Sequence, residues 1–248
     1  MPTAPLLAFD TSTELMAVAL KASGQSWQVQ TEGGARASAT LLPHIEALLV
    51  QAGLAWRDLG HIAFGCGPGA FTGLRTACAV AQGLGLGLGL PLLPIDSLLI
   101  VAEDARGQAA ADADASDFDV GVAMDARMDE VYAGHYRWQA GQWQVLQAPA
   151  LLSLPALAEA WSAAGPQGVA GSALDAFGPR LMLPPGVRRW PQVQHRAQAL
   201  LRLALRAAAS GQGLDAAAAL PLYLRDKVAQ TTAERETARA VASTATAP

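Results

Sequence analysis

The first part of the chain alternates between short apolar runs and polar turns, a pattern typical of β-strands. Runs over 6–10 and 16–21 are mostly apolar and are separated by a polar turn, and 26–30 has the composition of a third strand. Further along, Leu41, Leu42, Ile45, Leu48 and Leu49 recur at helical spacing. The pattern therefore predicts three strands followed by a helix that ends near residue 52.

Strand and helix patterns then alternate through the next fifty residues. The sequence predicts a strand over 61–65, a helix over 72–88, a strand over 91–95 and a helix over 97–105. Hairpin strands followed by parallel crossovers, in the order βββαβαβα, are the arrangement of one actin-like lobe. Residues 1–105 are therefore predicted to form a first lobe.

A second lobe is predicted over 119–225, after an Ala- and Asp-rich linker over 106–118. Its expected elements are strands over 120–124, 130–138 and 142–146, a helix over 157–164, a short strand into a turn over 169–172, a helix over 197–209 and an extended segment over 221–224. Both lobes open with a strand that ends in an aspartate, Asp10 or Asp125, which suggests an internal duplication. Residues 226–248 are expected to be a flexible tail.

Composition narrows the class of protein. The chain has 248 residues, of which 52% are hydrophobic and 15% charged, which is enough apolar material for a sizeable core. The net charge is −4, whereas a chain whose sole role is to hold nucleic acid is usually basic. Direct RNA binding as the only role is therefore not expected.

The sequence favours a cytoplasmic protein without a metal site. The start of the chain lacks a signal-peptide pattern, and the uncharged stretch over 76–95 is broken by glycines and prolines that would make a poor spanning helix. Cys66 and Cys78 are expected to be buried and to pack as small hydrophobic side chains, in a protein of a reducing compartment. No two histidines have ligand spacing and no nucleophile elbow is present, so we expect neither a metal nor a catalytic residue.

A glycine-rich turn over 67–75 joins the strand over 61–65 to the next helix. Such turns bring backbone N–H groups and a helix N-terminus to an anion. The turn over 10–13 offers a carboxylate and hydroxyls that could hold metal-bound phosphate, or it is a side-chain-stabilised hairpin turn. The residues expected near a phosphate or nucleotide are Asp10, Thr11, Ser12, Thr13, Gly67, Gly69, Asp125 and Arg127.

Two of these motifs have other interpretations. Gly65, Gly67 and Ala70 have the spacing of a dinucleotide fingerprint, with Asp96 at the end of the next strand. The charged cluster around Arg127 is a solvated hairpin, or it faces a cleft between the lobes. A dinucleotide-dependent oxidoreductase and a small actin-like ATP-dependent phosphotransferase are therefore alternatives.

The order of these motifs resembles the TsaB (YeaZ) family, the non-catalytic actin-like subunit of the machinery that makes N6-threonylcarbamoyladenosine in tRNA. The resemblance runs from residue 6 to about 235. It is carried by the segments 9–13, 42–43, 67–75, 81–84, 124–127, 130–132 and 221–225. It implies an α/β fold of two actin-like lobes of the ASKHA (ribonuclease H-like) type, with mixed sheets flanked by helices.

The resemblance also implies a role without catalysis. The catalytic paralogue TsaD carries a pair of metal-binding histidines whose places fall here at Ser97 and Val101, and Val101 has no donor atom. The implied partners are TsaD in a direct heterodimer, TsaE, functionally TsaC, and tRNA through the complex, with homodimers when the chain is alone. No cofactor is required by the chain itself, and ATP or ADP is expected at the interface of the complex.

The resemblance places the TsaD interface on the helices over 36–52 and 72–88. Small residues at Ala77, Ala81 and Gly85 would give the second helix a flat face, which suits either a partner helix or ordinary core packing. The expected interface residues are Leu41, Leu42, Ile45, Leu49, Phe71, Thr72, Leu74, Arg75, Cys78, Ala81, Gln82 and Gly85.

Overall fold

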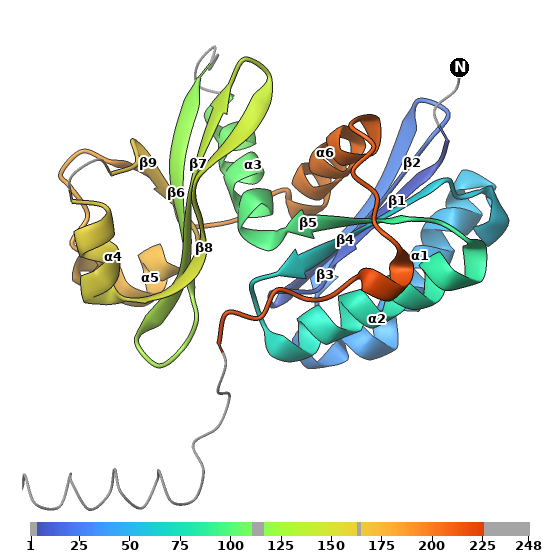
Figure 1. The fold of residues 1–248 in the computed structure, drawn as a ribbon, viewed down its shortest axis with the longest axis horizontal. Helices are drawn as coiled ribbons and strands as arrows, with labels where there is room; N and C mark the ends of the chain where they lie inside the picture. Colours follow the sequence, from blue (N-terminus) through green and yellow to red (C-terminus); the bar gives the residue numbers. More distant parts are fainter. Residues whose placement is uncertain (1–3, 111–116, 163–164, 226–248) are drawn as a thin grey trace, which may run out of the picture.

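Two five-stranded mixed sheets form the two lobes of the protein (Figure 1). The computed structural model describes residues 4–110, 117–162 and 165–225. In the first sheet an antiparallel meander is extended on its β1 side by two parallel strands, in the order β3-β2-β1-β4-β5. The strands are β1 (Leu6–Asp10), β2 (Leu15–Ala22), β3 (Gln25–Glu32), β4 (His61–Gly67) and β5 (Leu92–Asp96).

The second sheet repeats this topology strand for strand. Its meander is again extended by two parallel strands, in the order β8-β7-β6-β9-β10. The strands are β6 (Phe118–Asp125), β7 (Glu130–Gln139), β8 (Gln142–Ser153), β9 (Gly168–Ala170) and β10 (Arg188–Trp190). Asp10 and Asp125 therefore end the equivalent strands β1 and β6, as an internal duplication requires.

Helices cover both faces of each sheet. Helices α1 and α2 pack on the outer face of the first sheet, α4 and α5 pack on the second, and α3 and α6 lie between the lobes (Figure 1). Their bounds are α1 (Ala37–Ala52), α2 (Phe71–Leu88), α3 (Ser97–Ala110), α4 (Leu154–Ala160), α5 (Ala173–Phe177) and α6 (Arg196–Ala209). Four short 3-10 turns complete the elements: Gly34–Arg36, Trp56–Asp58, Gly178–Leu181 and Ala216–Ala218.

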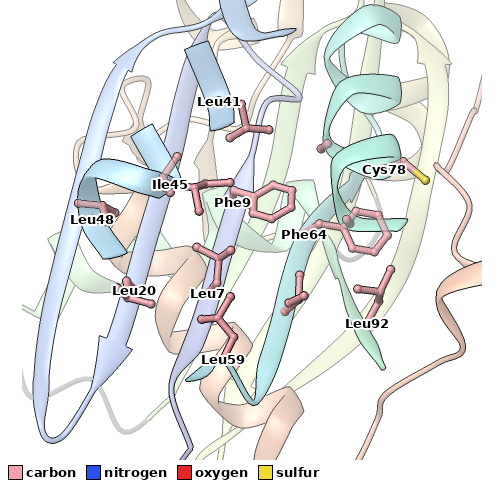
Figure 2. Packing of buried hydrophobic residues seen from close by; sticks show 14 of the residues in the cluster. Leu7, Phe9, Leu20, Leu41, Ile45, Leu48, Leu59, Phe64, Cys78 and Leu92 are labelled. Atoms are coloured by element: carbon pink, nitrogen blue, oxygen red, sulfur yellow. The ribbon is translucent and has the colours of Figure 1, made fainter. Parts of the chain in front are cut away.

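The main core lies between the first sheet and helices α1 and α2. Phe9 and Phe64 from the sheet meet Leu41 and Ile45 from α1, and all four side chains are fully buried (Figure 2). The helical spacing that the sequence shows at Leu41, Ile45 and Leu49 is thus the spacing of a core-facing stripe. Among the described residues, no helix is long and apolar enough to cross a membrane.

The C-terminal part of the chain does not stay with the second lobe. Helix α6 packs against β1 and β2 of the first sheet, and Ala216 and Ala219 join the first core. The second lobe expected over 119–225 is therefore corrected: its own sheet and helices end near Trp190, and the apolar face of α6 is buried on the first sheet.

Smaller boundaries also differ from those expected. Helix α3 continues to Ala110, so the linker predicted over 106–118 begins later, and 111–116 lie outside the described residues. Helix α4 begins at Leu154 because Ser153 Oγ accepts the Ala156 N–H at 3.3 Å, and it ends before the predicted 164. Residues 221–224, predicted as an extended segment, belong to no strand or helix. The tail predicted over 226–248 lies outside the described residues.

The junction of the lobes is held by two buried carboxylates on α3. Glu103 accepts hydrogen bonds from Arg106, Arg202 and the Trp143 indole, at 2.6–3.1 Å. Burial raises the pKa of the Glu103 carboxyl, but its hydrogen bonds and the nearby arginine charges outweigh burial and hold the pKa below its ordinary value. Asp104 accepts the backbone N–H groups of 194 and 195, just before α6.

Two glycines of α2 provide a matched test of how closely this helix approaches the turn after β1. A Cβ on Gly73 would overlap the Thr11 carbonyl oxygen, whereas a Cβ on Gly83 would meet nothing within 4 Å. We expect Gly73→Ala to destabilise the fold markedly, and Gly83→Ala to stabilise it by about 0.8–1 kcal/mol, the helix-propensity difference. Urea unfolding of both variants measures the difference, and equal stabilities would contradict this account of the close approach.

Candidate functional site: the cleft between the lobes

A cavity of about 620 Å³ lies between the two lobes. The segments that line it include the turn after β1, the glycine-rich turn before α2, the β6–β7 loop and the chain after η4 (Ala216–Ala218). The first residues of α3, the region of α5 and residues 191–196 also line it. Ser12, Thr13, Gly69, Asp125 and Arg127 all line the cavity, so the structure brings together most of the residues predicted to lie near a phosphate.

Asp10 is not free to hold a ligand, because its carboxylate is bound by Arg196. Arg196 Nε donates to Asp10 Oδ2 at 2.7 Å, and Nη2 lies 2.5 Å from the same oxygen. The Ser12 N–H and hydroxyl also donate to the carboxylate, at 3.1 and 3.0 Å. Both charged side chains are at most 1% exposed. The carboxylate that would hold metal-bound phosphate is thus fully occupied by groups of the chain itself.

The glycine-rich turn rests directly on the Asp10 turn. The Ala70 N–H donates to the Ser12 carbonyl at 2.7 Å, and the Gly67 N–H donates to Ser97 Oγ at 3.1 Å. A Cβ on Gly69 would overlap the backbone of Ser12, so glycine is required there by close approach. Two of the N–H groups of this turn therefore hold the fold together and are not available to an anion.

On the opposite lobe, the β6–β7 loop carries Arg127 to the mouth of the cavity. Residues 127, 128 and 129 have φ values of 67°, 57° and 58°, three successive left-handed residues without a glycine. The Arg127 side chain is 79% exposed and lies 3.9 Å from Asp125 Oδ2 and 4.0 Å from Glu14 Oε1. Such exposed ion pairs contribute little to stability, so Arg127 remains able to turn toward a ligand or a partner.

A C-terminal strap, residues 214–225, closes the cavity on the α2 side. The Ala219 carbonyl accepts hydrogen bonds from Gln82 Nε2 and Cys78 Sγ, at 2.9 and 3.4 Å. Tyr223 stacks on Phe71 with ring centroids 5.0 Å apart. The strap therefore covers a flank of α2, around Phe71, Cys78 and Gln82, that was expected to face a partner.

The strap ends on the opposite lobe. Arg225 forms an ion pair with Glu130 at 2.6 Å and donates to the Ala126 carbonyl at 3.0 Å. Since Tyr223 contacts α2 and Arg225 contacts the β6–β7 loop, three residues of the strap, 223–225, bridge the two lobes.

The structure divides the predicted partner-interface residues into two groups. The buried group belongs to the chain's own core and strap contacts: Leu41, Ile45, Leu49, Leu74, Cys78, Ala81 and Gly85. The accessible group is Leu42, Phe71, Thr72, Arg75 and Gln82. The expectation that the buried group forms a partner surface is therefore corrected, because their apolar side chains face the sheet and the strap.

Neither cysteine is set up for nucleophilic chemistry. Burial, followed by the charges of Asp96 and Asp10, raises the pKa of the half-buried Cys66 thiol to about 12. Burial also raises the pKa of Cys78. In the part of the chain that the structure describes, both cysteines are free, and no group of three or more His, Cys, Asp or Glu side chains could hold a metal ion.

Sequence reasoning did not find Arg196 or Tyr223 as site residues. An arginine at the start of an amphipathic helix is normally exposed, so its periodicity gives no signal of a buried ion pair. The sequence places Tyr223 in an extended segment and in the 221–225 motif of the family resemblance, but does not predict it as a site residue. The polar turn at Asp10 was the only available signal, because a buried carboxylate requires a compensating cation somewhere in the chain.

Comparison with known proteins identifies the family. A family model described as TsaD, tRNA N6-adenosine threonylcarbamoyltransferase, matches residues 32–184. The tRNA threonylcarbamoyladenosine biosynthesis protein TsaB of Escherichia coli (strain K12) is 31% identical, over 90% of this chain and 96% of that protein. The chain belongs to the TsaB (YeaZ) family. The TsaB protein of Haemophilus influenzae is 39% identical, over 51% of each chain.

A solved structure of YeaZ from Pseudomonas aeruginosa has the same fold as this TsaB-family chain. It superposes with a TM-score of 0.78 at 38% identity, over 90% of this chain and all of that one. The fold class predicted from the sequence, two actin-like α/β lobes with mixed sheets, is confirmed. Ser97 and Val101, which take the places of the TsaD histidines in the resemblance, are at most 2% exposed.

Replacing Arg196 tests the buried ion pair. Arg196→Met leaves the Asp10 carboxylate buried without a cation, and we expect it to lower the free energy of unfolding by about 3–5 kcal/mol. Adding Asp10→Asn to this variant removes the uncompensated charge and should recover part of the loss. Chemical denaturation of the wild type, both single variants and the double variant measures the coupling free energy between Asp10 and Arg196. A loss below about 1 kcal/mol in Arg196→Met would contradict a dominant role for the pair.

The raised pKa of Cys66 predicts that its thiol reacts slowly with alkylating reagents. At pH 8 a thiol of pKa about 12 is almost entirely protonated, so alkylation of the native protein by iodoacetamide should be much slower than that of glutathione. Mass spectrometry of quenched time points measures the rate, with the unfolded protein as the control. Native-state labelling of Cys66 as fast as in the unfolded protein would show that its thiol is not protected.

Proposed function

We propose that this TsaB-family chain is a non-catalytic subunit that binds TsaD and supports formation of N6-threonylcarbamoyladenosine at position 37 of tRNAs reading codons that begin with A. The relative that carries this proposal is the TsaB protein of Escherichia coli, of which the chain covers 96%. In this scheme TsaE joins the pair, TsaC supplies threonylcarbamoyl-adenylate, and tRNA is reached through the complex. ATP or ADP binds at the interface of the complex.

The observation that favours a role without catalysis is the Asp10–Arg196 ion pair. An actin-like phosphotransferase needs the carboxylate after its first strand to act on metal-bound phosphate. Here that carboxylate accepts four hydrogen bonds or ion-pair contacts from Arg196 and Ser12. The alternative of an ATP-dependent phosphotransferase, which rests on the 10–13 turn and the glycine-rich turn, therefore loses the carboxylate of the first of these two motifs.

The surface best suited to TsaD is the solvent-exposed face of α1 and α2. The predicted interface residues that are buried in the chain's own core do not belong to it. Leu42, Val50 and Leu86 are 42%, 78% and 65% exposed, so this face offers apolar side chains to a partner. On α2, at helical spacing from Leu86, the small residues Ala79 and Gly83 are exposed, so a partner helix could approach the backbone closely. The same face would serve a homodimer when TsaD is absent.

Gly83→Arg tests this surface without disturbing the fold. An added side chain at Gly83 meets open space, unlike one at Ala81, which is fully buried and would test folding instead. We expect wild type to form a stable complex with TsaD of the same organism in size-exclusion chromatography with light scattering. Gly83→Arg should weaken that complex at least about tenfold, because a large charged side chain enters a helix-packing interface.

The matched control is Val145→Arg, on the exposed side of β8 in the other lobe. It should bind TsaD as wild type does, and neither variant should melt below the wild-type temperature. Pairing of Gly83→Arg at wild-type affinity would move the interface elsewhere. Failure of wild type to pair, with or without nucleotide and TsaE, would overturn the proposed function.

A further inference from the structure

We infer that the C-terminal strap is a latch: it holds the cleft between the lobes closed, and its release at Arg225 lets the lobes move apart. Figure 1 shows the strap in red, running past α2 toward the second lobe. The movement belongs to the free chain, so it goes beyond the proposed function and does not depend on TsaD.

One side of the junction between the lobes is suited to be a pivot, because its links are buried and pass through α3. Asp96, at the end of β5, accepts a hydrogen bond from the Tyr136 hydroxyl of the second lobe at 2.6 Å. Glu103 of α3 accepts hydrogen bonds from α6 and from β8, at 2.6 and 2.8 Å. The chain itself crosses between the lobes on this side, from β5 into α3 and again over 191–195 into α6.

On the opposite side, next to α2, the strap is firmly attached to the first lobe. The Leu222 N–H donates to the Cys66 carbonyl of β4 at 2.7 Å. Tyr223 stacks on Phe71, and its hydroxyl accepts a hydrogen bond from Arg75 Nε at 3.1 Å. The strap therefore moves with the first lobe when the two lobes separate.

The attachment of the strap to the second lobe depends on Arg225. This side chain pairs with Glu130 at 2.6 Å and donates to the Ala126 carbonyl at 3.0 Å. In the part of the chain that the structure describes, the other ion pair across this side is Arg127–Glu14, at 4.0 Å and with both side chains about 80% exposed. Because such an exposed pair holds weakly, Arg225 is the contact whose loss frees the second lobe on this side.

The loop that Arg225 holds is strained. Residues 127–129 have φ values of 67°, 57° and 58°, a region that residues other than glycine rarely occupy. Strained backbone persists only where the surrounding contacts fix it, and Arg225 donates to the carbonyls of 126 and 127, at 3.0 and 3.4 Å. Release of Arg225 lets this loop relax, and that relaxation favours the open state.

Opening changes the cavity between the lobes. Residues 222–225 of the strap all line it, and so does Arg127 of the loop. A strap that stays on the first lobe while the loop leaves with the second lobe widens the cavity at this edge. The latch therefore sets how accessible the cavity of about 620 Å³ is to other molecules.

Distances between nitroxide labels on the two lobes, measured by pulsed electron paramagnetic resonance in the full-length chain, test the latch. Glu46→Cys on α1 and Glu159→Cys on α4 replace exposed side chains that lie outside the cavity lining. We expect one main distance for the otherwise unchanged chain. Arg225→Met should increase the population at longer distance at least about tenfold, because the ion pair and the hydrogen bonds to the loop are lost.

A second variant and a matched control locate the effect. Tyr223→Ala weakens the strap at its other end, on α2, and should also increase the longer-distance population. Arg180→Met removes the Arg180–Asp129 ion pair, which touches the same loop at 3.1 Å but lies within the second lobe, so it should leave the distances unchanged. The same labelling of a chain without the two added cysteines corrects for Cys66 and Cys78, and urea unfolding confirms that each variant is folded.

Three results would overturn the latch. The first is an unchanged distance distribution in both Arg225→Met and Tyr223→Ala. The second is equal opening in Arg180→Met, which would mean that loss of any charge near the loop has the same effect. The third is a predominant longer-distance population without any strap substitution, which would mean that the strap does not hold the cleft closed. No sample contains TsaD, so each outcome is separate from that of the proposed function.

Discussion

The ion pair between Asp10 and Arg196 constrains most of the rest of the structure. It joins the end of β1 to the start of α6, across 186 residues of sequence, with both charges buried. A buried charge without its partner is strongly destabilising, so α6 must lie on the first sheet in any stable fold of this chain. The turn after β1 is fixed by the same contacts, and the glycine-rich turn before α2 rests on that turn through the Ser12 carbonyl.

The two lobes have the same topology, but their equivalent aspartates differ in burial and in hydrogen-bond partners. In the first lobe Asp10 is sealed by an arginine and by the Ser12 turn. In the second lobe Asp125 is only partly buried, and its carboxylate accepts the backbone N–H of Arg127. The two equivalent strands therefore end in carboxylates with different surroundings, one neutralised by a buried arginine and one partly open to solvent.

The sequence predicted most elements of the fold but not what covers each helix face. Periodicity groups Leu41, Ile45 and Ala81 on apolar faces, and these faces are real. It cannot say whether a sheet of the same chain or a partner covers them, since both require the same apolar residues. Arg196 lay beyond prediction for a related reason: its burial follows from long-range packing, which leaves no local trace in the sequence.

The return of α6 and the strap to the first lobe has a consequence for how the chain is made. During synthesis the first 110 residues emerge with all the strands of their sheet, yet one face of that sheet and the partner of Asp10 are still missing. They arrive only after the whole second sheet has been translated. The N-terminal lobe therefore spends most of its synthesis with an open apolar face and an unpaired acid. Such a topology, with contacts between distant residues, favours slow maturation and a need for protection of the nascent chain.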